Sequence, residues 1–229
     1  LHLSIRRQRQ MCIRDRDGEP WIIKFPAHVD RADIGKMEYD YYLCAEQCGI
    51  TMSECNLFPS DKCSGYFGTK RFDRKNQHGE MERVHMLTVA ALLELDFEQP
   101  VLDYQDLMKL TKIITNNSPE DLENMYRRMC FNVYAHNRDD HAKNFSFLYE
   151  EEKKCWRLSP AYDLTYSTTY YGEHTTAVAG NGKNPGSKEL IFVGTQAGLS
   201  KEKCRSIAVE IKNCVSDMLS DCLLYTSDA

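Results

Sequence analysis

Residues 136–144 read HNRDDHAKN, and the rest of the chain is interpreted around this polar segment. An amphipathic stretch precedes it and opens at Ser118-Pro119, a hydroxyl N-cap with proline at the first helical position. After the segment, residues 145–149 alternate as a β-strand does, and residues 155–158 return after a charged turn. The sequence therefore predicts a polar loop between a long helix and a β-hairpin.

Outside this centre, the chain divides into a small part with strands and a larger part with helices. In the first part, the apolar runs 21–25 and 65–72 are predicted strands, and 35–48 between them repeats apolar residues at helical spacing. The helices predicted in the second part cover 84–95, 104–114, the stretch that opens at Ser118, and 201–219. We therefore predict an α+β fold with two lobes, a partial N-terminal lobe over residues 17–74 and a helical C-terminal lobe over 75–221.

The composition is that of a globular protein. Hydrophobic residues make up 42% and charged residues 28% of the 229 residues, which separates the chain from disordered proteins. No uninterrupted apolar run approaches the roughly 18 residues of a transmembrane helix, and the N-terminus lacks the apolar core and cleavage site of a signal peptide. The expected location is the cytoplasm, with no membrane partner.

The sequence contains ten cysteines, which raises the question of disulfides or a metal site. No Cys-x-x-Cys pair occurs, and the densest group, within residues 44–63, has no histidine at metal-ligand spacing. Cys44 and Cys48 are one turn apart in a predicted helix, where buried thiols behave as small apolar side chains. Free structural thiols in a reducing compartment are the favoured interpretation.

Both ends of the chain lack a fold-like pattern. Residues 3–16 (LSIRRQRQMCIRDR) and 222–229 (CLLYTSDA) resemble translated sequencing adaptors, so 1–16 and 222–229 are expected to be foreign to a native protein that has also lost its start. The alternative is a genuine basic arm at the N-terminus. Without their five Arg and two Asp, 24 basic and 32 acidic residues remain, a net charge of −8 in place of −5. Such an acidic body is not expected to bind nucleic acid, because neutralising phosphates needs a basic face.

Three residues have the chemistry that phosphoryl transfer requires. The reaction needs a carboxylate near the attacking hydroxyl, an amide and a second carboxylate for Mg²⁺, and a cation near the phosphates. Asp139 and Asn144 have the Asp-x-x-x-x-Asn spacing of kinase catalytic loops, and Asp163 follows one hairpin later. Taken alone, Asp139 would be a turn or capping acid, the commoner role of Asp beside a helix end. The three residues together favour a magnesium–triphosphate site.

Two motifs resemble the HipA-like serine/threonine protein kinases, the toxin components of bacterial toxin–antitoxin pairs. The first is DDHAKNFS at 139–146, and the second is WRLSPAYD at 156–163. Three weaker matches accompany them: 22–24 (IIK) to the family's ATP-lysine strand, 70–74 (KRFDR) to its hinge, and 181–183 (NGK) to a segment after the metal loop. The resemblance implies a two-lobed protein-kinase-like fold, ATP and Mg²⁺ as cofactors, and phosphorylation of a protein serine.

The resemblance also implies roles for individual residues. Asp139 would be the general base, and Asn144 and Asp163 would bind Mg²⁺. Lys24 would contact the ATP phosphates, and Glu38 on the first predicted helix would pair with it. Lys70 to Phe72 would meet adenine through backbone groups. The full set of expected ATP-binding residues is Lys24, Lys70, Arg71, Phe72, His141, Ala142, Lys143, Asn144, Tyr162 and Asp163.

Other functions stay open at this point. A kinase-fold phosphotransferase that acts on a small molecule or a lipid would carry the same phosphate-binding residues, and a catalytically weak kinase fold could serve as a binding module. A metal site built on His136 and His141 is disfavoured, because a spacing of five residues does not put both on one helix face. We assign His136 a structural role.

One expected feature of such a kinase is missing from the sequence. A Gly-rich phosphate loop should precede Trp21, and none is found there. Because the backbone N–H groups of such loops cradle phosphate, the full-length parent is expected to be an active kinase, whereas this chain should bind ATP weakly or not at all. The expected partners are a protein substrate, by resemblance a translation component, and a helix-turn-helix antitoxin.

Overall fold

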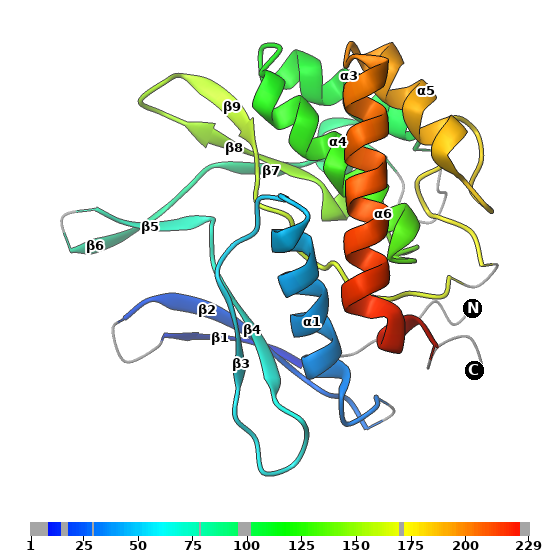
Figure 1. Cartoon of the computed structure of the whole chain (residues 1–229). Helices are drawn as coiled ribbons and strands as arrows, with labels where there is room; N and C mark the ends of the chain where they lie inside the picture. Colours follow the sequence, from blue (N-terminus) through cyan, green and yellow to red (C-terminus); the bar gives the residue numbers. More distant parts are fainter. Residues whose placement is uncertain are drawn as a thin grey trace.

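The N-terminal lobe is built on an antiparallel sheet (Figure 1). The structure is a computed structural model that describes residues 9–14, 18–28, 30–77, 79–95, 102–169 and 172–224. The strands of the N-terminal sheet lie in the order β1-β2-β4-β3. They are β1 (Arg9–Arg14), β2 (Pro20–Phe25), β3 (Cys55–Phe58) and β4 (Tyr66–Lys70). All neighbouring strands are antiparallel, and Trp21 of β2 lies opposite Lys70 of β4.

Close packing joins β2 and β4 at the centre of this sheet. Trp21 and Ile23 of β2 are buried, and Ile22 between them is less so, as alternation in a strand requires. Gly68 of β4 has no room for a side chain, because a Cβ there would lie 2.5 Å from Phe58 Cε2 and 2.6 Å from Ile23 Cδ1. The glycine therefore lets these two side chains cover the middle of the sheet.

Helix α1 (Ile34–Gln47) packs on β3 and β4 and also contacts the last helix of the C-terminal lobe (Figure 1). Its inner face buries Tyr41, Cys44 and Ala45 completely. The Tyr41 hydroxyl donates a 2.7 Å hydrogen bond to the carbonyl of Ala135 in the C-terminal lobe. α1 therefore links the two lobes.

The C-terminal lobe is mainly helical. Its larger helices are α3 (Tyr104–Ile114), α4 (Pro119–Tyr134), α5 (Ser187–Ala197) and α6 (Lys201–Leu224). α4 begins at Ser118, whose hydroxyl accepts a 3.3 Å hydrogen bond from the N–H of Asp121, and most of its residues are buried. α6 packs on α1, α4 and α5, so it contacts both lobes.

Two smaller β-structures complete the fold. A hairpin of β5 (Arg74–Gln77) and β6 (Glu80–Arg83) lies in the connection between the lobes. Strands β7 (Met86–Thr88), β8 (Ser146–Glu150) and β9 (Cys155–Leu158) form an antiparallel sheet in that order. The predicted hairpin after the polar loop is therefore confirmed as β8 and β9. The predicted strands 21–25 and 65–72 and the predicted helices 35–48, 104–114 and 201–219 are confirmed in the same way, within a few residues at their ends.

The prediction of a single helix over 84–95 is wrong. Strand β7 occupies 86–88 and pairs with β8, and only Val89–Leu92 form a helix, α2. Thr88 ends the strand and caps the helix, since its Oγ1 accepts a 3.2 Å hydrogen bond from the N–H of Ala91. A short apolar run fits either period, and here the pairing with β8 decides in favour of a strand.

The N-terminal segment also differs from the expectation that it has no fold-like pattern. Residues 9–14 form β1, which pairs with β2 from Arg9 opposite Phe25 to Arg14 opposite Pro20. That 1–16 and 222–229 are foreign to the native protein stays a prediction, as do the lobe limits. Of these segments, 1–8, 15–16 and 225–229 lie outside the described residues.

The nine cysteines from Cys44 to Cys222 are free thiols. Several are fully buried, and burial raises the pKa of the Cys130 thiol in α4. Such thiols pack as small apolar side chains. In the described part of the chain, every helix is too short or too polar to cross a membrane.

Candidate active site

Lys24 lies where the two lobes meet. It belongs to β2, is only 8% exposed, and its Nζ forms ion pairs with Glu38 of α1 and with Asp163 on the loop after β9. The ammonium group also lies 5.6 Å from the centroid of the Phe67 ring in β4, within cation–π range. The predicted pairing of Lys24 with Glu38 is therefore confirmed, and the fold adds Asp163, 139 residues away in sequence.

Charge pairing sets the protonation of these groups. Burial alone would lower the pKa of Lys24, but the carboxylates of Glu38 and Asp163 outweigh burial and raise it. In return, the Lys24 ammonium lowers the pKa of Asp163 below its ordinary value. At neutral pH, Lys24 is therefore a cation and Asp163 an anion, the charges suited to a phosphate and a divalent cation respectively.

Asp163 is held by the residue before it. Its φ of +54° lies in the left-handed region, which side-chain-bearing residues rarely adopt. The Tyr162 ring lies 5.6 Å from that of Phe72, between ring centroids, and the Tyr162 hydroxyl donates a 2.7 Å hydrogen bond to the carbonyl of Lys143. These contacts fix Tyr162 between the predicted hinge and the polar loop. The next residue, Asp163, is thereby held with its carboxylate beside Lys24, where the two lobes meet.

Asp139 and Asn144 are joined through the loop that contains them. Residues Ala142–Asn144 form a 3₁₀ turn, and Asn144 Nδ2 donates a 2.9 Å hydrogen bond to the carbonyl of Asp139. The Asp139 carboxylate is 48% exposed, and its Oδ1 lies 4.0 Å from Nε2 of His141. The hydrogen bond between Asn144 and Asp139 therefore constrains the loop, while the Asp139 carboxylate stays accessible to a hydroxyl group.

The adjacent acid, Asp140, is turned into the protein instead. Its carboxylate accepts hydrogen bonds from the Tyr104 hydroxyl at 2.9 Å and the Thr176 N–H at 3.0 Å, and His174 Nδ1 lies 3.1 Å away. Thr176 Oγ1 also donates to the Asp140 carbonyl. These bonds anchor the loop in the C-terminal lobe. Sequence patterns do not single out these supports, because they lie at least 34 residues away.

A buried arginine supports the start of the segment that carries Asp163. Arg128 of α4 is 1% exposed, donates through Nε to Asn124 Oδ1 at 2.9 Å, and donates through Nη2 to the carbonyl of Ser159. Burial lowers the pKa of its guanidinium to about 9. Arg128 therefore connects the central helix of the core to the turn that precedes Tyr162 and Asp163.

The hinge residues are only partly brought to the site. The N–H of Lys70 donates to the carbonyl of Glu54 at 2.8 Å, and the N–H of Arg71 donates to that of Pro20 at 2.9 Å. Both side chains form ion pairs with neighbouring acids. Phe72 is the hinge residue placed beside the site, through its ring contact with Tyr162. The adenine contacts of Lys70, Arg71 and Phe72 stay a prediction.

A small cavity lies beside Lys24 between the lobes. Its volume is about 30 Å³, and its lining includes Lys24, Glu38 and Asp163 together with the apolar Met52 and Phe67. A space of that size holds a water molecule and not a nucleotide. A triphosphate would therefore approach from the open side, where the Asp163 carboxylate is 42% exposed.

The residues present fit a magnesium ion. Because the Nδ2 group of Asn144 donates to the Asp139 carbonyl, its Oδ1 is the atom left to face a cation. Asp163 supplies an anionic oxygen, and the hydrogen bond from the Tyr162 hydroxyl to the Lys143 carbonyl joins the loop that carries Asp163 to the turn that carries Asn144. Hard oxygen donors of this kind suit Mg²⁺. Ala142 and Lys143 lie on the same turn, and their part in ATP binding stays a prediction.

A strand lysine paired with a helical glutamate and a loop aspartate, beside an Asp-x-x-x-x-Asn loop, is the arrangement of protein-kinase-like folds. The chain belongs to the HipA-like C-terminal domain family, which matches residues 3–218. The resemblance seen in the sequence is thereby confirmed.

Individual relatives agree with this assignment. The chain is 27% identical to "Putative kinase Y4dM" of Sinorhizobium fredii over 175 residues, 70% of this chain and 41% of that protein. The fold is similar to that of HipA from Shewanella oneidensis MR-1, solved with HipB and its operator DNA, with a TM-score of 0.71 and 18% identity over 89% of this chain and 52% of that one. It is also similar to the Helicobacter pylori proinflammatory kinase CtkA, with a TM-score of 0.58 and 13% identity over 92% of this chain and 89% of that one. The α+β kinase-like fold is confirmed, and the chain spans less than half of the curated relative.

Replacing Lys24 by methionine should lower the free energy of unfolding by about 3–5 kcal/mol, because Glu38 would stay buried without its cation. Lys36→Met is the matched control, because Lys36 and Asp40 form an exposed ion pair on α1, the helix that carries Glu38. This control should lower the free energy of unfolding by about 0.5 kcal/mol or less. Urea unfolding followed by circular dichroism measures both. Equal losses in the two variants would contradict a special role for the buried pair.

Asp163 should contribute to the loss of stability in acid. Because Lys24 lowers the pKa of Asp163, the carboxylate stabilises the folded state above about pH 4, and this contribution is lost as the pH falls through the lower folded pKa. Asp163→Asn should therefore lose less stability than the wild type on acidification below about pH 4. Urea unfolding at several pH values tests this, with Asp106→Asn on the exposed face of α3 as the control. Superimposable pH profiles for Asp163→Asn and the wild type would refute it.

Proposed function

We propose that this chain forms the catalytic part of an ATP-dependent, HipA-like serine/threonine protein kinase that acts in the cytoplasm. The observation that carries the proposal is the buried ammonium of Lys24, paired at once with Glu38 and Asp163. In protein kinases the lysine–glutamate ion pair has to be in place for phosphoryl transfer. The family match and the Asp-x-x-x-x-Asn loop support the same activity.

Each polar group of the site has a distinct task in this proposal. Asp139 orients the substrate serine hydroxyl and accepts its proton as the oxygen attacks the γ-phosphorus of ATP, and its partial exposure supports that role. Asn144 and Asp163 hold Mg²⁺, which neutralises charge on the transferred phosphate when it is bound. Lys24 contacts the phosphates. Glu38 keeps Lys24 in place while Asp163 coordinates the cation.

A binding module without catalysis explains this arrangement less well. A buried ion pair is a weak source of stability compared with well-packed apolar side chains. A scaffold would therefore have little physical reason to keep Lys24, Glu38 and Asp163 together beside an accessible Asp139. A phosphotransferase that acts on a small molecule or lipid would use the same groups, and the labelling experiment below separates it from a protein kinase.

The proposed partners rest on one solved structure and on the family resemblance of the sequence. The Shewanella HipA structure contains HipB and operator DNA. We extend this to the present protein as a helix-turn-helix antitoxin, with a translation component as the phosphorylated substrate. DNA would be reached through the antitoxin, because the chain itself is acidic, with a formal net charge of −5.

Asp139→Asn in the full-length kinase should reduce phosphoryl transfer by at least about 100-fold, since the general base is lost. Transfer of radiolabel from ATP to the proteins of a cell lysate measures the activity, and serine should carry the label. Asp106→Asn, an exposed acid on α3, is the control and should leave the rate unchanged. Label found only in small molecules or lipids would refute a protein kinase, and full activity of Asp139→Asn would refute the assignment of the base.

The 229-residue chain itself should bind Mg-ATP with a dissociation constant above about 1 mM, because no Gly-rich phosphate loop precedes Trp21. Isothermal titration calorimetry on this chain and on residues 17–221 tests the expectation, with the full-length kinase as the positive control. Tight binding by residues 17–221 would show that the loop is dispensable.

A further inference from the structure

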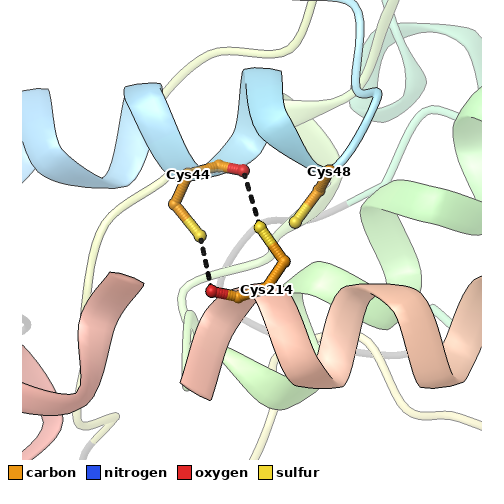
Figure 2. Close-up of side chains that lie close together, drawn as sticks. All are labelled: Cys44, Cys48 and Cys214. Atoms are coloured by element: carbon orange, nitrogen blue, oxygen red, sulfur yellow. Dashed lines mark hydrogen bonds between the residues drawn. The ribbon is translucent and has the colours of Figure 1, made fainter. Parts of the chain in front are cut away.

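Away from the kinase site, three cysteines meet where α1 packs on α6 (Figure 2). Cys44 lies on α1, Cys48 caps the end of the same helix one turn later, and Cys214 faces both from α6. Their three Sγ atoms all lie within 4.8 Å of one another. Cys44 and Cys48 are buried, and Cys214 is partly exposed, so the cluster has one side open to solvent.

Regular helices hold these thiols together. Cys44 Sγ donates to the carbonyl of Cys214 at 3.9 Å, and Cys214 Sγ donates to the carbonyl of Cys44 at the same distance (Figure 2). Thiols are weak donors, so these contacts orient the sulfurs without binding them strongly. The cluster is therefore preformed on rigid elements, with sulfur atoms that are easily released to another partner.

The donors in this cluster are all sulfur. Met218 lies one turn after Cys214 on α6, and its thioether sulfur is 3.7 Å from Cys214 Sγ. Among the described residues, the group of side chains close enough to share one ion consists of the three cysteines, without a carboxylate or an imidazole. Thiolate and thioether donors select soft ions such as Cu(I). Structural zinc sites almost always have four ligands, which this group does not supply.

We propose that Cys44, Cys48 and Cys214 form a binding site for a soft, thiophilic metal ion, with Cu(I) as the ion that best suits the donors. Each thiol releases its proton to solvent as its S–Cu bond forms, and the copper stays Cu(I) throughout. Arg127 donates a 2.9 Å hydrogen bond from Nη1 to the carbonyl of Cys48 and brings positive charge near the anionic site. Part of that charge is balanced by Glu123 and Glu210.

An ion at this position would join α1 to α6 directly. α1 also carries Glu38, the partner of Lys24, so metal binding would hold that helix against the C-terminal lobe. The metal site does not depend on the proposed kinase activity. The competing interpretation, three buried thiols that act as small apolar side chains, predicts no selective binding of an ion.

The experiment is an anaerobic titration of the reduced, metal-free 229-residue chain with Cu(I), in competition with a chromogenic Cu(I) chelator. We expect a single tight Cu(I) per chain and an X-ray absorption spectrum with sulfur alone in the first coordination shell. Cys214→Ser and Cys48→Ser should each weaken the tight binding by at least about 100-fold, because each removes a ligand. Cys155→Ser, at a partly exposed cysteine of β9, is the matched control and should bind as the wild type does.

Thermal unfolding of the metal-free variants verifies that each one is folded. If a variant is not folded, the X-ray absorption spectrum of the wild type still tests whether sulfur alone binds the copper. Wild-type affinity in both Cys214→Ser and Cys48→Ser would overturn the site. An equal loss in Cys155→Ser, or nitrogen and oxygen neighbours around the copper, would overturn it as well. Preferential binding of Zn²⁺ over Cu(I) would overturn the assignment of the ion.

Discussion

Burying the ammonium group of Lys24 requires compensating negative charge, because an isolated cation in the protein interior is strongly disfavoured. Glu38 of the N-terminal lobe and Asp163 of the C-terminal lobe supply that charge. Strand β2, helix α1 and the loop after β9 must therefore converge on one point, which fixes how the lobes face each other. The contacts of Tyr162 with Phe72 and Lys143 bring the hinge and the polar loop to the same place.

Asp139 and Asp140, which are adjacent in the polar loop, have different roles. Asp140 is buried and fully engaged by groups of the C-terminal lobe, whereas the carboxylate of Asp139 remains open to solvent. A reactive carboxylate needs to be both accessible and fixed, and a single residue could not easily satisfy both needs. Because Asp139 and Asp140 are adjacent in the chain, the hydrogen bonds that hold Asp140 also restrict the backbone of Asp139. The hydrogen bond from Asn144 to the Asp139 carbonyl completes the loop.

Local patterns in the sequence were sufficient for the long helices, the β8–β9 hairpin and the spacing of Asp139, Asn144 and Asp163, because helical periods and loop motifs are properties of contiguous residues. They were insufficient where distant pairing decides the outcome. β7 is a strand because β8 lies beside it, and β1 exists through its pairing with β2. The supports of Asp140 and the approach of Cys214 to Cys44, 170 residues apart, depend on the tertiary fold in the same way.

The packing of α6 on α1 has a consequence for the order in which the protein can assemble during its synthesis. A growing chain on the ribosome displays Lys24, Glu38 and Asp163 well before residues 201–224 have emerged from the exit tunnel. Until then, α1 lacks one of the surfaces against which it is buried, and nothing from the last helix braces the N-terminal lobe. Completion of the cleft is therefore coupled to the synthesis of α6, and a chain interrupted before α6 would have the charged residues of the site without the helix that packs on α1.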